Sequence, residues 1–225
     1  MTFHVLTIFP EMFSALEHSI IRRAKDAGFI SINYVNIRDF SADRHRRVDD
    51  YPYGGGAGMV MSAQPIFDAY ASIGAQNARV CYLSPGGRVF DHAGAVQMAK
   101  EPEIILLCGH YEGVDQRVID AIVTDEISIG DFVLSGGEIA AMAVIDAVSR
   151  QVAGVIKEGS LAQESFSAGL LEYPQYTRPY EFLGRQVPEV LISGHHENIE
   201  KWRKERAFER TQKMRPDLLI GINHE

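Results

Sequence analysis

Hydrophobic and polar positions alternate between strand-like and helix-like spacing through residues 1–150 of this chain. Alternation typical of strands occurs at 3–9, 30–37, 79–83, 103–108 and 123–129, and helical spacing occurs at 11–28, 91–100, 115–122 and 137–148. Strands that alternate with helices are typical of a parallel sheet with helices packed on it. We therefore expect an α/β fold with a parallel sheet.

Glycine-rich loops follow three of the predicted strands, after Leu83, Cys108 and Ile129. Loops at the carboxyl ends of parallel strands are where open α/β sheets bind ligands, so the three loops predict one pocket. None of them fits a phosphate-binding fingerprint, which disfavours a nucleotide-dependent oxidoreductase. Exposed backbone groups beside apolar side chains would instead suit a neutral adenosine, with Glu112 or Asp131 near a cationic group.

The pattern changes after residue 150. Residues 1–150 are expected to form the ligand-binding domain, 151–172 a flexible linker, and 173–225 a small helical domain whose main helix begins near Ser193 as its N-cap. Residues 38–62 read as a long polar loop with a glycine cluster, and loops of that length are usually functional.

Composition narrows the class of protein. With 225 residues, 46% of them hydrophobic, the chain can bury a core. It shows neither the basic start of a signal peptide nor an apolar run long enough to span a bilayer, so we expect a cytoplasmic protein with no membrane partner. Cys81 and Cys108 lie in apolar runs and are expected to be buried thiols, without a disulfide, zinc or another dedicated metal site.

Charge is distributed unevenly along the sequence. Residues 201–215 carry seven basic and two acidic side chains, a net charge of +5, which leaves −13 for the rest of a chain whose total is −8. A second basic cluster runs from Arg44 to Arg47. Either cluster could be a solvated surface, or the two could contact nucleic-acid phosphates.

Several motifs carry a resemblance to a known family. They are Tyr53-Gly-Gly-Gly-Ala-Gly-Met-Val-Met61, Leu83-Ser-Pro-Gly86, Cys108-Gly-His-Tyr-Glu-Gly113, Ile129-Gly-Asp-Phe-Val-Leu-Ser-Gly-Gly-Glu138, Gly169-Leu-Leu-Glu-Tyr-Pro-Gln-Tyr-Thr-Arg-Pro179 and Met214-Arg-Pro-Asp-Leu-Leu219. In this order, and over essentially the whole chain, they resemble the bacterial tRNA (guanine-N1-)-methyltransferases, the TrmD family. The resemblance implies a SPOUT-class fold, with a deep trefoil knot in the C-terminal part of the α/β domain, and an obligate homodimer.

The resemblance also implies an activity, which is methylation by S-adenosylmethionine of guanine N1 at tRNA nucleotide 37, next to the anticodon. Magnesium is described for the family, although no ligand spacing here reveals it. Residues implied to contact the cofactor are Leu83, Ser84, Pro85, Gly109, Tyr111, Glu112, Ile129, Gly130, Asp131, Phe132, Val133, Leu134, Gly136 and Gly137. Those expected to contact tRNA are Arg44, Arg46, Arg47, Lys201, Arg203, Lys204 and Arg215.

Two catalytic residues carry over from the family. Glu164, before Ser165-Phe166, stands where the family has its catalytic Asp and would remove the N1 proton, while Arg150 would stabilise charge on guanine O6. Arg150 could instead complement a helix dipole, and Glu164 could be a solvated linker carboxylate. His110, where close relatives often carry Arg, is expected to be a surface histidine. Alternatives are a SPOUT methyltransferase of ribose 2′-OH or ribosomal RNA, and a non-catalytic RNA-binding protein.

Overall fold

The computed structural model describes residues 1–75, 77–161 and 163–220 of the chain. The chain divides into two compact units, Met1–Ile156 and Lys157–Glu225. The first unit therefore ends a few residues after the predicted boundary at 150, and residues 157–172 are counted with the second unit.

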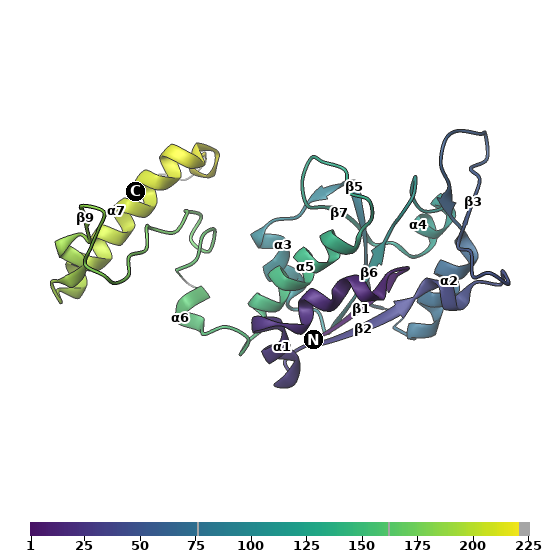
Figure 1. Cartoon of the computed structure of the whole chain (residues 1–225), viewed down its shortest axis with the longest axis horizontal. Coiled ribbons are helices and arrows are strands. Elements are labelled where there is room, and N and C mark those ends of the chain that lie inside the picture. The colour runs from purple at the N-terminus through teal and green to yellow at the C-terminus, as the bar shows by residue number, and fades with distance from the viewer. Residues whose placement is uncertain (76, 162, 221–225) are drawn as a thin grey trace. The chain divides into compact units, whose positions relative to one another are not determined.

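The first unit is built on a five-stranded sheet in the order β2-β1-β6-β5-β7, and every pair of neighbours in it is parallel (Figure 1). The strands are β1 (Thr2–Thr7), β2 (Ser31–Asn36), β5 (Arg79–Val89), β6 (Glu103–Cys108) and β7 (Asp125–Ser128). The central strand β6 is buried from Ile104 onward, as expected for a parallel strand covered on both faces. The parallel α/β fold predicted from the sequence is confirmed.

Two hydrophobic clusters cover the two faces of this sheet. Alternate positions of β6 separate them, because Ile104 and Leu106 belong to one cluster and Ile105 and Leu107 to the other. The first cluster includes α1 (Ser19–Asp26), α3 (His92–Met98) and α5 (Glu138–Gln151), and the second includes α2 (Ala63–Ile73) and α4 (Gln116–Ile122). Figure 1 shows the same two groups of helices on opposite sides of the sheet.

Some predicted boundaries in the first unit differ from the structure. The first predicted helix is a 3₁₀ helix, η1 (Pro10–Glu17), followed by α1, because Ser19 at the start of α1 has a φ of 56° that no continuous helix allows. The predicted loop 38–62 begins within η2 (Ile37–Phe40) and contains β3 (Asp49–Asp50) and β4 (Val60–Met61). The predicted loop 84–87 lies inside strand β5. Its pairing with β7 is interrupted after Leu83 and resumes at Arg88.

The second unit is organised around α7 (His196–Met214). Its other described elements are α6 (Glu158–Leu161), the antiparallel pair β8 (Glu181–Phe182) and β9 (Arg185–Gln186), η3 (Glu189–Ile192) and η4 (Pro216–Leu219). The predicted N-cap was wrong: His195 occupies that position, while Ser193 is the C-cap of η3 and its Oγ accepts from the His195 N–H at 3.2 Å. Residues 221–225 of the predicted C-terminal domain lie outside the described part of the chain.

The predicted linker carries hydrogen bonds inside the second unit. Leu171 N donates to Thr211 Oγ1 of α7 at 2.9 Å, and Glu172 N donates to Ser165 Oγ at 3.0 Å. The Arg203 guanidinium lies 4.9 Å from the ring centroid of Tyr173. Leu171 and Tyr173, at the end of the predicted linker and just after it, therefore contact α7.

Both cysteines are free and buried, as predicted, and burial raises the pKa of the Cys81 thiol to about 12. No described helix combines the length and the apolar character that a membrane crossing requires.

Candidate functional site

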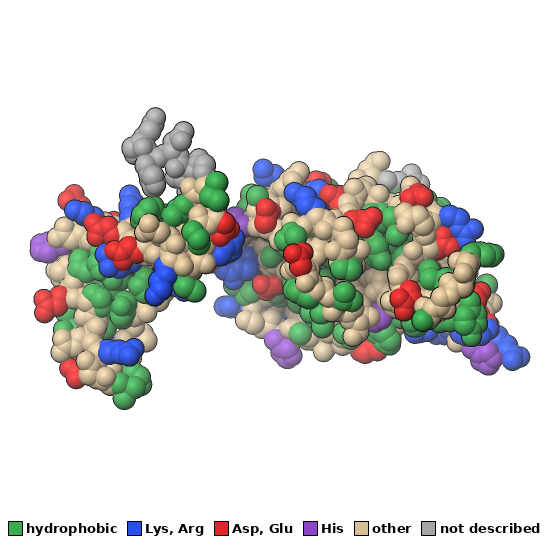
Figure 2. All heavy atoms as spheres, turned by 90° about the horizontal axis from the view of Figure 1, so that it is seen from above, with side chains coloured by type: hydrophobic (Ala, Val, Ile, Leu, Met, Phe, Trp, Pro, Cys, Tyr) green, Lys and Arg blue, Asp and Glu red, His purple; other side chains and the backbone are tan. Residues whose placement is uncertain are grey.

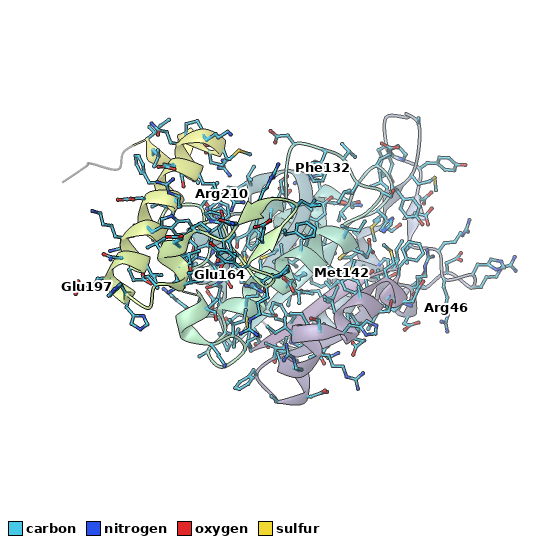
Figure 3. The ribbon with its side chains drawn as sticks, turned by 60° about the vertical axis from the view of Figure 1, so that its left-hand side comes forward. Arg46, Phe132, Met142, Glu164, Glu197 and Arg210 are labelled. Carbon is cyan, nitrogen blue, oxygen red and sulfur yellow. The ribbon has the colours of Figure 1, made fainter. Side chains whose placement is uncertain are left out.

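A pocket of about 280 Å³ lies where β5, β6 and β7 end. Three stretches of chain form its walls: the end of the regular part of β5, the loop after β6, and the loop from β7 to α5. Phe132 of the last loop is labelled in Figure 3. The lining residues are Tyr82, Leu83, Ser84, Pro85, Gly109, His110, Tyr111, Glu112, Gly113, Ile127, Ser128, Ile129, Gly130, Phe132, Val133, Leu134, Ser135, Gly136, Gly137 and Ala140.

The structure brings together around this pocket every residue predicted to bind the cofactor except Asp131, which is exposed and does not line it. Their role in binding stays a prediction. The sequence interpretation missed Tyr82, His110, Gly113, Ile127, Ser128, Ser135 and Ala140. Most of these lie inside or beside the glycine motifs, so the motifs themselves were the signal that could have identified them.

Glycines let the loop before α5 pass directly over the end of β6. A Cβ added to Gly137 would lie 2.7 Å from Cys108 Cα, closer than real contacts allow. The Gly137 N–H donates to the Gly109 carbonyl at 2.9 Å, and Gly136 forms an antiparallel bridge with His110. The position requires the absence of a side chain, and the close approach holds this part of the pocket lining against the end of β6.

The glycine cluster at 54–58 is connected to the same pocket. Glu112 N donates to the Met59 carbonyl at 2.9 Å, and Met61 N donates to the Gly113 carbonyl at 2.9 Å. Gly58 has a φ of 82°, and a Cβ there would lie 2.3 Å from a Glu112 carboxylate oxygen. The long predicted loop therefore holds one rim of the pocket.

A buried polar cluster lies behind the pocket wall. Glu138, the first residue of α5, is fully buried, and its two carboxylate oxygens meet Thr7 Oγ1 at 2.6 Å and His110 Nε2 at 2.7 Å. The His110 side chain is only 13% exposed, so the prediction of a surface histidine was wrong. The reason is that the loop after β6 turns the ring back toward the first turn of α5.

The two predicted catalytic residues do not line this pocket. Arg150 lies in the last turn of α5, whereas Glu138 begins that helix beside the pocket. Twelve residues of α-helix separate the two along the helix axis by about 18 Å. Glu164 belongs to the second unit and is labelled in Figure 3; its N–H donates to the Leu161 carbonyl at 3.3 Å.

The predicted RNA-contacting residues are on the surface, but several are already paired. Arg46 meets Asp39 at 3.1 Å and projects from the first unit in Figure 3. The Arg47 guanidinium donates to Asp43 and lowers the pKa of that carboxyl to about 2. Arg44 is exposed, and its Nε donates to His45 Nε2 at 2.8 Å.

The basic segment 201–215 of the second unit likewise contains both paired and exposed basic residues. Arg203 pairs with Glu200 at 2.7 Å and Arg215 with Asp217 at 2.7 Å, whereas Lys201 and Lys204 are exposed. Figure 2 shows basic and acidic side chains interspersed on the visible faces. Among described residues, no group of three or more His, Cys, Asp or Glu side chains converges as metal ligands would.

A parallel α/β domain with a glycine-lined pocket at the carboxyl ends of its strands defines a class of small-ligand-binding domains. The TrmD family model, described as tRNA (Guanine-1)-methyltransferase TrmD, matches residues 1–220 of this chain. The chain therefore belongs to the TrmD family.

Named relatives agree with that match. A tRNA (guanine-N(1)-)-methyltransferase of Caldicellulosiruptor saccharolyticus is 58% identical over 225 residues, which are 99% of this chain and 92% of the relative. One of the same name from Streptococcus agalactiae is 58% identical over 220 residues, 97% of this chain and 87% of the relative. A third, from an Exiguobacterium species, is 54% identical over 223 residues, 99% of this chain and 94% of the relative.

Proposed function

We propose that this protein methylates guanine N1 at tRNA nucleotide 37, with S-adenosylmethionine as the methyl donor. The observation that carries the proposal is the pocket, which is lined by all but one of the residues expected to hold the cofactor in a chain of the TrmD family. Because tRNA is its substrate, we propose that the protein acts in the cytoplasm.

The lining fits an adenosine with an amino-acid tail better than it fits a phosphate. Phe132, Leu134 and neighbouring apolar residues offer surface for the adenine, and glycine backbone groups offer hydrogen bonds. The lining contains neither Lys nor Arg, which would be expected around phosphates, and it contains Glu112 for a cationic group. When bound, the cofactor supplies a methyl group on a sulfonium, which needs no further activation.

The residues of the chain must then position guanine and remove the N1 proton. We assign proton removal to Glu164 and stabilisation of the negative charge on guanine O6 to Arg150. We assign magnesium no step in the reaction, because no described cluster of side chains offers it a dedicated site.

We further propose the trefoil knot and the homodimer of the family. Support for the knot comes from the resemblance and from the tight crossing of the 128–137 loop over the end of β6. Support for the homodimer comes from Arg150, which α5 holds about 18 Å along its axis from the pocket end. A site that needs both the pocket and Arg150 is completed more readily by two chains than by one.

For tRNA recognition, we propose that Lys201 and Lys204, with the other basic residues of 201–215 and with 44–47, contact phosphates. The reactive guanine must leave its stack to reach the pocket. The predicted linker, residues 151–172, would close over it once tRNA is bound.

The test is a product analysis. The purified protein is incubated with S-adenosylmethionine carrying a labelled methyl group and with unmodified tRNA, and the tRNA is digested to nucleosides. The expected product is 1-methylguanosine, and it should disappear when the guanosine at nucleotide 37 is replaced. Recovery of the label in 2′-O-methylribose would support a different RNA methyltransferase, and no turnover would support a non-catalytic RNA-binding protein.

A further inference from the structure

The buried chain Thr7–Glu138–His110 is not explained by the proposed catalytic roles. It links three elements: Thr7 ends β1, His110 follows β6, and Glu138 begins α5. The Thr7 hydroxyl donates to Glu138 Oε1 at 2.6 Å, while His110 Nε2 contacts Oε2 at 2.7 Å. Thr7 and Glu138 have no exposed surface, whereas His110 lines the pocket.

A fully buried carboxylate requires compensation, because removing a charge from water is costly unless it is paired and hydrogen-bonded. Among described residues, His110 alone lies within ion-pair distance of Glu138. The Glu138 carboxylate therefore holds the Nε2 side of the imidazole through this 2.7 Å contact. When Nε2–H is directed at Glu138, the protonated ring has Nδ1–H as its remaining donor for a ligand.

Packing fixes the orientation of this ring. The Phe9 ring meets it edge-on with a centroid separation of 5.0 Å. The backbone N–H of His110 donates to Met61 Sδ at 3.2 Å. The bridge between His110 and Gly136 holds the backbone on its other side. A Cβ at Gly136 would lie 2.0 Å from His110 Nε2, so the glycine leaves room for the pair.

The lining residues also show what a charged imidazole would recognise. His110 is the one lining side chain that can carry a positive charge, and Glu112 is the carboxylate of the lining. One potential cation and one carboxylate around the same pocket complement a ligand whose amino-acid portion carries both an ammonium and a carboxylate.

We propose that His110, positioned by Glu138 and Thr7, recognises the α-carboxylate of the amino-acid portion of the ligand. This inference rests on the proposed use of S-adenosylmethionine. It assigns the buried Glu138 a positioning role, because Glu138 orients the ring and stabilises its charge without touching the ligand.

Affinity for the carboxylate should then depend on the charge of His110. Charged or titratable groups near the ring are Glu138 from α5, Glu112 and Tyr111 from its own loop, Cys108 from β6, Tyr82 from β5, and Arg38, whose guanidinium is 5.8 Å from the centroid of Phe9. Burial raises the pKa of Tyr82 and holds that of Cys108 well above its usual range, so both stay neutral. Histidine is the residue type that changes charge between about pH 5 and 8.

The experiment measures binding by calorimetry with two probes, S-adenosylhomocysteine and methylthioadenosine, which lacks the amino-acid carboxylate. For His110→Gln, affinity for S-adenosylhomocysteine should fall by about 10- to 100-fold, the range for a hydrogen bond between charged groups. Affinity for methylthioadenosine should not change. In the wild type, S-adenosylhomocysteine should bind more weakly as pH rises from 6 to 8, and His110→Arg should remove that dependence.

The positioning role has its own matched pair. Thr7→Val, which removes the donor to Glu138, should weaken S-adenosylhomocysteine binding and alter its pH profile, whereas Thr7→Ser should preserve both. Glu138→Gln should act like Thr7→Val if it folds.

Other results would overturn the inference. Equal losses for both probes in His110→Gln would make the histidine merely structural, and affinity that rises with pH would make it an acceptor. No loss for either probe would exclude any role. If the wild type bound neither probe, the proposed cofactor would be wrong and this inference would fail with it, which is a different result from a pocket that binds both probes regardless of His110.

Discussion

Gly137 occupies a position where even one added carbon has no room. A Cβ at this residue would lie 2.7 Å from Cys108 Cα and 3.1 Å from Gly109 N, and neither atom belongs to a side chain that can swing away. Gly137→Ala should lower the free energy of unfolding by about 1–3 kcal/mol, the usual cost of overpacking. It should also abolish S-adenosylhomocysteine binding, because the pocket loop must shift.

Urea denaturation and calorimetry check this prediction, with Gly159→Ala as the matched control. Gly159 lies in α6 and has no atom within 4 Å of an added Cβ. That substitution should be neutral or slightly stabilising, since alanine favours helix by roughly 0.5–1 kcal/mol over glycine. Equal stability of the two variants would contradict the steric argument.

The proposed role of Glu164 as general base can be tested with one substitution that keeps its size and another that keeps its carboxylate. Removing a general base typically costs about 10²- to 10⁴-fold in rate. Glu164→Gln should therefore slow methyl transfer by that amount in single-turnover assays, while S-adenosylmethionine binding stays normal. Glu164→Asp should stay active, because it keeps the carboxylate and matches the family residue. A wild-type rate for Glu164→Gln would place the base elsewhere.

At the scale of elements, an ion pair joins the edge strand β7 to β5. The Arg79 guanidinium makes two hydrogen bonds to the Asp125 carboxylate, at 2.8 and 2.6 Å, and both side chains are mostly buried. This contact lowers the pKa of Asp125. Asp125→Asn should lower the free energy of unfolding by roughly 1–3 kcal/mol at neutral pH, since the hydrogen bonds involve charged partners.

The lowered pKa of Asp125 makes the free energy of unfolding depend on pH. A carboxyl whose pKa is lower in the folded state contributes stability that is fully present above its unfolded value of about 3.9 and is lost as pH falls through the folded value. Denaturation between pH 7 and 2 should show a smaller acid-induced loss for Asp125→Asn than for the wild type. Asp26→Asn is the control: its partner Arg22 is 3.5 Å away and both are well exposed, so the effect should stay within about 0.5 kcal/mol. Identical acid profiles for Asp125→Asn and the wild type would refute the assignment.

Elements whose pattern reflects burial on one sheet could be predicted from the sequence, and elements set by tertiary contacts could not. Strand β6 was predicted correctly, because a short unbroken apolar run between polar ends is typical of a buried parallel strand. Helix α2 was not predicted, although Pro65 in its first turn and Gly74 at its end, with a φ of 73°, are both compatible with a helix. Strand β5 continues through Pro85 and the following glycines only because β7 pairs with it again from Arg88.

The candidate site divides in the same way. The family resemblance carried by the glycine motifs included 13 of the 20 lining residues, because a loop that contacts a ligand through its backbone needs particular residues, glycine above all. The pairing of His110 with Glu138 could not be predicted, since it joins residues 28 apart in the chain through the crossing of two loops. Asp131 was included although it does not line the pocket, because a motif does not show which of its side chains are exposed.

At the scale of the whole molecule, charge separation along the chain predicts how RNA is recruited. Lys201 and Lys204 are exposed on α7, whereas Arg203 is engaged with Glu200 and Tyr173. The double variant Lys201→Glu, Lys204→Glu should weaken tRNA binding and reduce the slope of log affinity against log salt by roughly 1–2, since each phosphate contact contributes about 0.7–0.9. Filter binding over a salt series measures both quantities.

Two comparisons make that result specific to the basic segment. Binding of S-adenosylhomocysteine should be unchanged in the same variant. Arg22→Glu, which changes an exposed charge on α1, should leave the salt slope unaltered. A slope that is the same in the double variant and the wild type would mean that these lysines do not contact RNA.

In the proposed homodimer, each active site combines the pocket of one chain with Arg150 of the other. Gly136→Val should destroy the pocket, since even a Cβ there would lie 2.0 Å from His110 Nε2; the matching variant is Arg150→Ala. Each alone should be inactive. After subunit exchange of equal amounts, half of the dimers are mixed, and each has one site with both lesions and one with neither, so about a quarter of wild-type activity should return. Exchange is followed by energy transfer between labelled chains, and exchange without recovered activity would show that the site is not shared in this way.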